Sequence, residues 1–375
     1  MPLRKTLTAC WQRLQGQLFP WLEEELGPLG DRHRRLVTVL DVVGVEAFLP
    51  YRRGGAGCPP SDRAALARAF VAKAVFNLPT TGLLIERLSV DKTLRRLCGW
   101  ERLGSVPSES TFSRAFAEFA RSALPSRLHQ ALIESTHAER LVGHVSRDST
   151  AIEAREKPAA LPGKPKRGRG RPRKGEEAPR RRRRLERQLD MTLEEMLADL
   201  PRHCAVGTKR SAKGYRSSWT GYKLHLDVAD GMVPLSALLS AASLHDSQAA
   251  IPLATLTAAR VRSLYDLMDS AYDVGEIKDH SRSLGHVPII EANPWGKAER
   301  KRELALEAER RRHAGYQTAE KIRYGERTAA ERVNARLKDD FGGRTVRVRG
   351  HDKVMCHLMF GILALTVDQL MRLVP

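Results

Sequence analysis

The sequence predicts an α/β fold with a mixed sheet and flanking helices, preceded by an all-α N-terminal region. Two observations predict it. Up to about residue 140, apolar residues recur at three- and four-residue spacing, which is typical of helices. From about residue 142, short strand-like runs bounded by glycine or proline alternate with helical stretches, and this order builds an α/β layer. A length of 375 residues and a mass of 41.9 kDa make two domains the expectation.

The first domain is expected over residues 1–140. Its clearest helices are residues 61–76, residues 81–98 and a third after the sequence VPSES. In the third helix Ser108 or Ser110 is a suitable N-cap, and Phe112, Phe116 and Phe119 follow at i, i+4 and i+7. Short helices joined by such turns fit a helix-turn-helix that binds DNA, although a plain helical bundle fits the pattern equally well.

The second domain is expected over residues 141–375. Its strands are expected at residues 144–154, 221–230, 232–243, 263–273 and 286–293, with helices at about 247–262 and 273–284 and long helices afterwards. The second and third of these strands are separated by one short turn, so we expect them to pair as a hairpin.

A basic insert is expected to interrupt this domain at about residues 155–205. Residues 164–187 hold thirteen basic and three acidic residues, a net charge of +10, with no apolar period, so the insert is expected to be disordered when unbound. Arg169, Arg171 and Arg173 could enter a narrow minor groove of DNA. The alternative is a solvated linker that binds phosphates without regard to sequence.

Net charge and cysteine usage narrow the class of protein. The chain has 64 Lys plus Arg and 44 Asp plus Glu, a net charge of +20, which indicates a polyanionic partner, nucleic acid rather than a membrane surface. The five cysteines are far apart and never form C-x-x-C, so a reducing, cytoplasmic location is expected. The N-terminus lacks the apolar core of a signal peptide, and the apolar stretch Val354–Val374 carries charged residues that favour a buried helix.

Three acidic residues are candidates for catalysis. Asp148 lies in the first expected strand, Asp269 ends a later one, and Glu331 lies on a helix near the C-terminus. If the three carboxylates converge, they would hold two divalent cations, and such hard oxygen ligands favour Mg²⁺ or Mn²⁺. Taken singly, each acid could equally be an ordinary cap or a surface carboxylate.

The helix around Glu331 carries the most specific pattern. Tyr324, Arg327, Glu331 and Lys338 form Y-x2-R-x3-E-x6-K, and on a helix these offsets fall within roughly 60° of one face. That face would combine a metal-binding carboxylate with groups that grip phosphates. The alternative is an exposed amphipathic helix with an i, i+4 Arg–Glu pair.

These residues resemble the DDE transposases of bacterial insertion sequences, in the group that carries the Tyr-Arg-Glu-Lys signature. The resemblance extends to W-x-G-Y-K-L-H, SLHDSQAA, DSAYD and VPSESTFSRAFAEF, and is weakest over the basic insert. It implies an RNase H-like catalytic domain in which Asp148, Asp269 and Glu331 bind two Mg²⁺ or Mn²⁺ ions. It also implies that Tyr324, Arg327 and Lys338 contact transposon-end DNA.

The partners that the resemblance implies are double-stranded DNA, both transposon ends and target, and a second copy of the chain in a homodimeric DNA complex. No membrane is involved, and the bound protein would associate with the nucleoid. Only about 62 positions separate Asp269 from Glu331, so residues 297–312 are expected to be a simple helix rather than an inserted β-domain.

The predicted function is binding of terminal inverted repeats, cleavage of the DNA strands and joining of the 3′ ends to target DNA by two-metal-ion chemistry. The alternatives are a stand-alone RNase H-like nuclease and a catalytically silent or domesticated sequence-specific DNA-binding protein. Because the metal would activate the nucleophile, His225 and His245 are expected to be structural.

Overall fold

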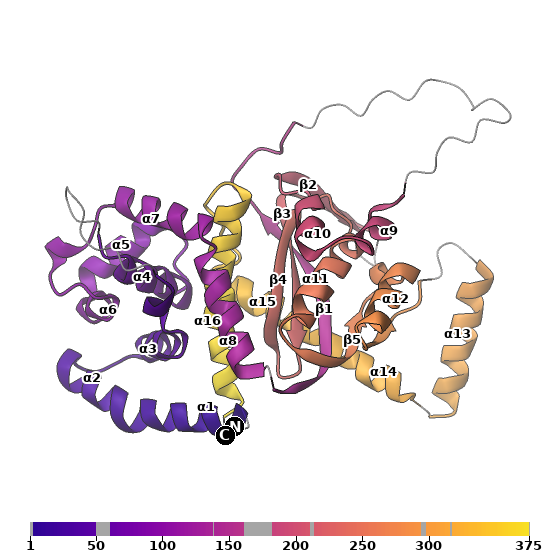
Figure 1. Cartoon of the computed structure of the whole chain (residues 1–375), viewed down its shortest axis with the longest axis horizontal. Helices are drawn as coiled ribbons and strands as arrows, with labels where there is room; N and C mark the ends of the chain where they lie inside the picture. The colour runs from indigo at the N-terminus through magenta and orange to yellow at the C-terminus, as the bar shows by residue number, and fades with distance from the viewer. Residues whose placement is uncertain are drawn as a thin grey trace.

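The computed structural model describes residues 3–49, 61–137, 139–160, 182–210, 214–293, 298–315 and 317–374. A helical N-terminal region lies beside an α/β region, and the C-terminal helix α16 (His351–Arg372) runs between the two (Figure 1). This arrangement confirms the predicted α/β class with an all-α N-terminal region.

The N-terminal region consists of short helices with local caps. They are α1 (Leu3–Arg13), α2 (Phe19–Leu26), α3 (Asp31–Val43), α4 (Arg63–Val75), α5 (Thr81–Val90), α6 (Lys92–Cys98), α7 (Glu109–Arg121) and α8 (Leu124–His137). Thr80 caps α5, since its hydroxyl accepts a hydrogen bond from the Leu83 amide at 3.1 Å. Ser108 occupies the N-cap position of α7, but its hydroxyl bonds the hydroxyls of Ser110 and Thr111 instead of a backbone amide.

The sheet is mixed and has six strands. They are β1 (Leu141–Glu153), β2 (Ala205–Arg210), β3 (Arg216–Ala229), β4 (Val233–Ala241), β5 (Arg262–Met268) and β6 (Val287–Ile290). The order is β2-β3-β1-β5-β6. The first half of the long strand β3 pairs with β2, and its second half pairs with β4. The strands β1, β5 and β6 are parallel, whereas β1 and β3 are antiparallel.

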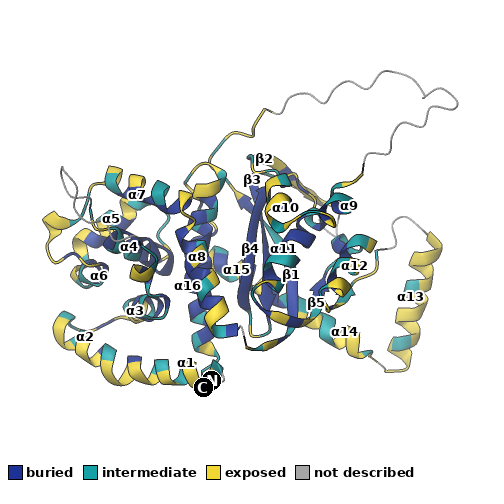
Figure 2. Cartoon of the chain, in the orientation of Figure 1, coloured by how far each residue is buried: buried dark blue, intermediate teal, exposed yellow. Residues whose placement is uncertain are grey.

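The predicted hairpin is present as β3 and β4. Its turn contains Gly231 and Met232 with φ of 78° and 59°, and two consecutive positive φ values match the twist of the flanking strands. The expected helices of this region are α11 (Ala250–Ala258), α12 (Gly275–Ser283) and the exposed helix α13 (Ala298–His313), which projects from the sheet (Figure 2). The segment between Asp269 and Glu331 therefore has no inserted β-domain among its described residues.

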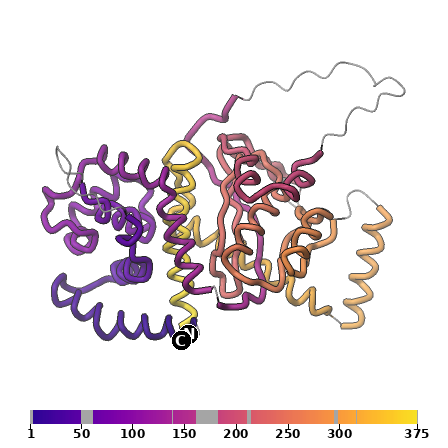
Figure 3. The backbone as a smooth tube through the Cα atoms, viewed as in Figure 1, coloured from indigo at the N-terminus to yellow at the C-terminus, as the bar shows by residue number. Residues whose placement is uncertain are grey.

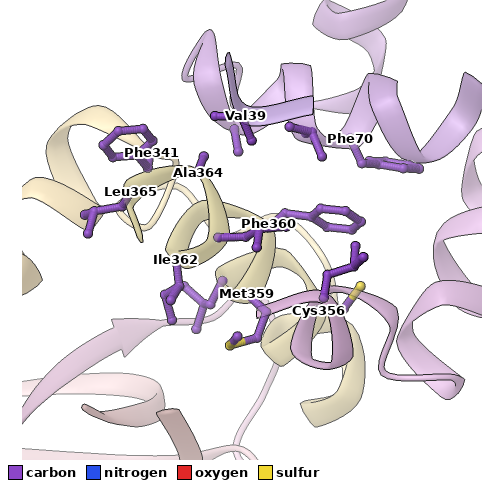
Figure 4. Packing of buried hydrophobic residues seen from close by; sticks show 14 of the residues in the cluster. Val39, Phe70, Phe341, Cys356, Met359, Phe360, Ile362, Ala364 and Leu365 are labelled. Carbon is purple, nitrogen blue, oxygen red and sulfur yellow. The ribbon is translucent and has the colours of Figure 1, made fainter. Parts of the chain in front are cut away.

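The helix α16 unites the two regions. Its side chains pack against α3, α4, α7 and α8 on one side and against β4 on the other. Phe360 stacks on Phe70 of α4 at a centroid distance of 5.9 Å, and Figure 4 shows Met359 and Ile362 on the same helix near the sheet. One hydrophobic cluster therefore extends from the N-terminal helices into the sheet, with the end of the chain beside its beginning (Figure 3).

The apolar C-terminal stretch is a core helix, as predicted. Among the described helices, α16 alone has the length and apolar composition to cross a bilayer, but 78% of its apolar window is buried inside the fold. Polar residues such as Thr366 and Gln369 are buried there too.

The insert differs from the expectation of disorder up to about residue 205. Residues 184–188 and 193–199 form the short helices α9 (Arg184–Gln188) and α10 (Leu193–Asp199). Leu185 and Met196 are buried in a cluster with Ile251 of α11, and Arg184 pairs with Asp199 at 2.7 Å. Burial of Leu185 and Met196 therefore orders this segment, although its high charge predicted disorder. The other residues of this prediction, 161–181, with Arg169, Arg171 and Arg173, lie outside the described residues.

Candidate active site

Asp148 and Asp269 lie at the same edge of the sheet. The strands β1 and β5 are parallel neighbours, and Ser146 pairs with Leu267. Two residues further along each strand are Asp148 and Asp269, and neighbouring strands are about 4.8 Å apart. Asp269 follows the end of β5 and caps the next turn, where its Oδ1 accepts a hydrogen bond from the Ala271 amide at 3.0 Å. Two carboxylates therefore stand side by side where β5 ends and β1 continues.

The segment that carries Glu331 is fixed over this edge. It consists of α14 (Ala319–Tyr324), the 3₁₀ turn η6 (Gly325–Arg327) and α15 (Thr328–Asp340). Three alternate residues of β1 bind it: Ser146 Oγ donates to the Glu326 carbonyl at 3.1 Å, Asn334 Nδ2 donates to Asp148 Oδ2 at 3.3 Å, and Lys338 Nζ donates to Thr150 Oγ1 at 2.6 Å. Alternate residues of a strand point to one face, so α15 covers the face of β1 that bears Asp148.

Glu331 is turned toward its own helix. Its carboxylate accepts a hydrogen bond from Arg327 at 2.8 Å, and the Glu331 side chain is 51% exposed. Consequently, no three His, Cys, Asp or Glu side chains in the described part of the chain are gathered closely enough to hold a metal ion.

The electrostatics nevertheless join the three acids in one site. Burial, together with the charges of Asp269 and Glu331, raises the pKa of Asp148 to about 6 against the lowering effect of the Ser149 amide and Arg327. Burial also raises the pKa of Asp269. A carboxylate that is buried beside other carboxylates, with a single amide bond to its Oδ2, is short of positive charge.

The donor set fits a divalent cation. Carboxylate oxygens are the ligands that Mg²⁺ and Mn²⁺ prefer, and neutralising Asp148 and Asp269 would relieve their repulsion. Glu331 can join them by a change of rotamer, because an exposed i, i+4 ion pair contributes only about 0.3–0.5 kcal/mol. Asp148, Asp269 and Glu331 are thus the residues that would hold the metal.

The Tyr-Arg-Glu-Lys residues lie along one side of this segment, but they are not on one regular α-helix, since η6 interrupts it. The Arg327 guanidinium lies 5.6 Å from the centre of the Tyr324 ring, and the Tyr324 hydroxyl donates to Glu291 at 3.1 Å. Lys338 lies two turns beyond Glu331 and bonds Thr150. Burial raises the pKa of Tyr324 to about 12 and lowers that of Lys338.

Two further residues, Asn334 and Asp246, belong to the site and were not predicted as site residues from the sequence. Asn334 holds Asp148, and its position three residues after Glu331 on the same helix face was a readable signal. Asp246 pairs with Lys223 at 2.7 Å, and its charge is close enough to raise the pKa of Asp269. Asp246 lies in the SLHDSQAA sequence, but it does not directly follow a strand-like run, so there was no local sign of a site residue there.

The histidines have structural partners. His225 is buried and its Nε2 shares a hydrogen bond with the Ser240 hydroxyl at 2.8 Å. His245 caps the turn η4 (Asp246–Ala249) through its Nδ1. Both contacts agree with the expectation of a structural role.

Comparison with known families agrees with this geometry. Residues 144–367 match a family described as the transposase DDE domain, and residues 22–118 match a second family described as a transposase domain. No curated protein and no solved structure is significantly similar to the chain. The DDE match covers the sheet except for the first three residues of β1, together with α15 and most of α16, which is more than half of the chain. The chain belongs to the DDE transposase family of insertion sequences, whose members depend on divalent metal ions and act on DNA.

Proposed function

We propose that the protein binds the terminal inverted repeats of its element, cleaves the DNA strands and joins the 3′ ends to target DNA. The observation that carries this proposal is the register of β1 and β5, which sets Asp148 beside Asp269 beneath the helix that bears Glu331. A reaction at a phosphodiester needs negative ligands for metal ions at one defined point, and this edge supplies them.

In this proposal each residue of the site has one task. Asp148, Asp269 and Glu331 hold two Mg²⁺ or Mn²⁺ ions, which when bound activate water and then the 3′-hydroxyl and stabilise the leaving oxygen. Arg327 releases Glu331 to the site and turns its guanidinium to a DNA phosphate. Tyr324 and Lys338 contact the transposon end on either side of Glu331. Asn334 keeps Asp148 aimed at the reacting phosphate.

The proposal also assigns the parts outside the site. Residues 1–140 bind DNA, and the basic insert binds phosphates through Arg169, Arg171 and Arg173. Two copies of the chain act together in the DNA complex.

The test of the triad uses three isosteric variants, Asp148→Asn, Asp269→Asn and Glu331→Gln. Each should lower cleavage and strand transfer of an end-bearing duplex by at least about a thousandfold, because each removes a charged metal ligand, while DNA affinity stays within about threefold. Glu326→Gln is the matched control, because Glu326 lies on the same segment and its carboxylate has no contact with the three acids among the described residues. Full activity in any one triad variant would overturn its assignment.

The two alternatives give different outcomes. A stand-alone nuclease would cut unrelated duplexes as fast as its own ends and would produce no joined product. A catalytically silent DNA-binding protein would bind the ends and leave them uncut with either metal. We favour the transposase because all three acids are present and the segment that carries Glu331 also presents Tyr324, Arg327 and Lys338.

The insert is tested by deleting residues 164–181, which hold nine basic and two acidic residues, a net charge of +7. This deletion spares α9, whose Arg184 pairs with Asp199. The slope of log affinity against log salt concentration should become shallower, by about 0.9 for each phosphate contact that is lost. Cleavage of saturated DNA should persist. An unchanged slope would mean that the insert does not contact DNA.

A further inference from the structure

A cationic pocket lies away from the three acids, where the N-terminal helices meet α16. It is an open pocket of about 490 Å³ between α4, the start of α5, α7 and the chain just before and inside α16. Five of its side chains are cationic and one is anionic: Lys73, Arg155, Arg347, Arg349 and Lys353 against Glu109. The pocket therefore has a strong excess of positive charge.

Lys73 is the unusual member of this pocket. It lies on α4 among buried apolar residues, is only 8% exposed, and has no hydrogen bond or ion pair with any described residue. Burial lowers its pKa to about 8. A largely buried lysine without an ion pair is costly, so its position on the wall of a pocket favours an anion there.

The remaining cations are also available to a ligand. Arg155, Arg347 and Lys353 are exposed and have no ion pair with any residue that the structure describes. The helix α5 begins at the pocket with Thr80 as its cap, and the start of a helix favours a negative charge.

The pocket wall is rigidly joined to the catalytic strand. Glu156, just after β1, accepts hydrogen bonds from the Gly350 amide at 3.2 Å and from the Tyr222 hydroxyl at 2.6 Å. The Arg349 side chain donates to the Arg155 carbonyl at 3.0 Å. These bonds hold the segment before α16 against the end of β1.

Both β1 and α15 lead from the three acids to this pocket. Asp148 and Arg155 are seven residues apart along β1 and the chain that follows it, which is roughly 20 Å. At the far end of α15, the Asp339 carbonyl accepts a hydrogen bond from Asn77, between α4 and α5. Between the two sites lies Lys338, whose pKa is lowered by burial and then by the nearby charges of Arg344 and Lys209.

We propose that this pocket binds a phosphodiester of the DNA strand that passes through the active site, with Lys73 as its buried cation. The inference rests on the proposed function, because it assumes that DNA lies over the three acids. A span of roughly 20 Å places the bound phosphate about six base pairs from the reacting one. Lys338 between the two sites suits a continuous polyanion, whereas a free phosphate ion would need only the pocket.

The experiment compares Lys73→Met and Arg347→Ala with the control Arg310→Met, which removes one exposed cation from α13. The probe is a duplex of about 30 base pairs, titrated at KCl concentrations from about 50 to 200 mM. Over this range the affinity of the wild type should fall about 3.5-fold more than that of Lys73→Met or Arg347→Ala, since each variant loses one phosphate contact. Arg310→Met should behave as the wild type does.

Ethylation interference on an end-bearing duplex locates the contact. Ethylating one or two phosphates about six nucleotides from the cleavage position should weaken binding of the wild type but not of Lys73→Met. Lys73→Met should melt no lower than the wild type, because it removes an unpaired buried charge. Arg347 is exposed, so its variant keeps the test valid even if Lys73→Met does not fold.

Three results would overturn the inference. In the first, both pocket variants match Arg310→Met in salt slope and interference pattern while the wild type still cleaves DNA. In the second, inorganic phosphate raises the melting temperature of the wild type but not of Lys73→Met, while both bind DNA equally well. That result would make the pocket a site for a free anion. In the third, the wild type fails to bind or cleave DNA at all, and then the proposed function fails with it.

Discussion

Arg147 and Asp148 are adjacent in β1 but face opposite sides of the sheet, and the two sides treat charge differently. Arg147 is 2% exposed and forms a bidentate pair with Asp227 of β3, with both N–O distances at 2.8 Å. Asp148 faces α15, where an amide at 3.3 Å is the partner of its Oδ2 and two other carboxylates are near. One charge is fully compensated within the protein, whereas the other is left in excess.

The compensated side forms a network that ties the sheet to the helices behind it. Asp227 also accepts a hydrogen bond from Thr257 of α11 at 2.6 Å. Asp266 of β5 lies near the same arginine, and its carboxylate bonds His286 at 3.2 Å and the Ser281 hydroxyl. Hydrogen bonds to His286, the charge of Arg147 and the Ser281 hydroxyl together lower the pKa of Asp266 despite its burial. A buried charge with this many partners stabilises one arrangement of strands and helices.

The difference between the two sides of β1 shows how one strand can be held rigidly on one face and carry a reactive site on the other. The paired side fixes the position of β1, and on the other side Asp148 and Asp269 have no ion pair with any described residue, which leaves them open to a cation from outside the chain. Reactivity is therefore placed where the fold does not satisfy charge, as expected for functional sites.

The largest effect should come from breaking the compensated side. Arg147→Met leaves Asp227 buried without its cation, so the free energy of unfolding should fall by about 3–5 kcal/mol. Urea denaturation of the metal-free protein measures this loss. The double variant Arg147→Met/Asp227→Leu should recover most of it, because no charge is then left unpaired. A loss below about 1 kcal/mol in the single variant would show that the pair does not fix the sheet.

The uncompensated side should respond in the opposite direction. Because the pKa of Asp148 in the folded protein, about 6, is above its ordinary value, the folded state binds this proton more tightly than the unfolded state does. Ionised Asp148 thus lowers stability above pH 6, and the penalty disappears as the pH falls toward 4. Asp148→Asn should raise the free energy of unfolding at pH 7–8 by about 1–3 kcal/mol, without metal, and by almost nothing near pH 4.

Urea denaturation of metal-free Asp148→Asn and wild type at both pH values tests this sign. Glu299→Gln is a suitable control, since it removes one exposed carboxylate from α13 and leaves Asp148 in place. A variant that is less stable than the wild type at pH 8 would mean that the carboxylate stabilises the fold rather than strains it.

The same contrast explains which parts of the fold the sequence could predict. Strand content and glycine-bounded turns placed β1, β5 and the β3–β4 hairpin, and the apolar spacing placed α7 and α16. The strand β2 was missed, because AVGTKR has no strong alternation and becomes a strand by pairing with the first half of β3. The helices α9 and α10 were missed because their order depends on Leu185 and Met196 packing on distant residues.

The candidate site follows the same rule. Asp148, Asp269 and Glu331 could be chosen by position and resemblance, since Asp148 lies in an expected strand, Asp269 ends another and Glu331 lies in a specific spacing. The register that brings the two aspartates together, the Asn334 contact and the turning of Glu331 to Arg327 depend on the folded geometry. No local pattern encodes them, because they join residues that are more than a hundred positions apart or choose between two rotamers.

The smallest effect, and the most specific test of this contrast, concerns Arg327, whose positive charge acts on both Asp148 and Asp269. Its pair with Glu331 is exposed, so Arg327→Gln should change the free energy of unfolding by less than about 0.5 kcal/mol. Its charge nevertheless lowers the pKa of Asp148 and Asp269, and its hydrogen bond holds Glu331 away from them.

In Arg327→Gln, Mg²⁺ should bind about two- to fivefold more tightly at pH 8, because one repelling charge is gone and Glu331 is free to turn. At pH 5.5 the advantage should shrink, since the pKa of Asp148 rises and protons compete better for the same oxygens. Calorimetric titration of Mg²⁺ at both pH values measures the change, and weaker binding at pH 8 would mean that Arg327 helps to assemble the metal site instead of occupying its place.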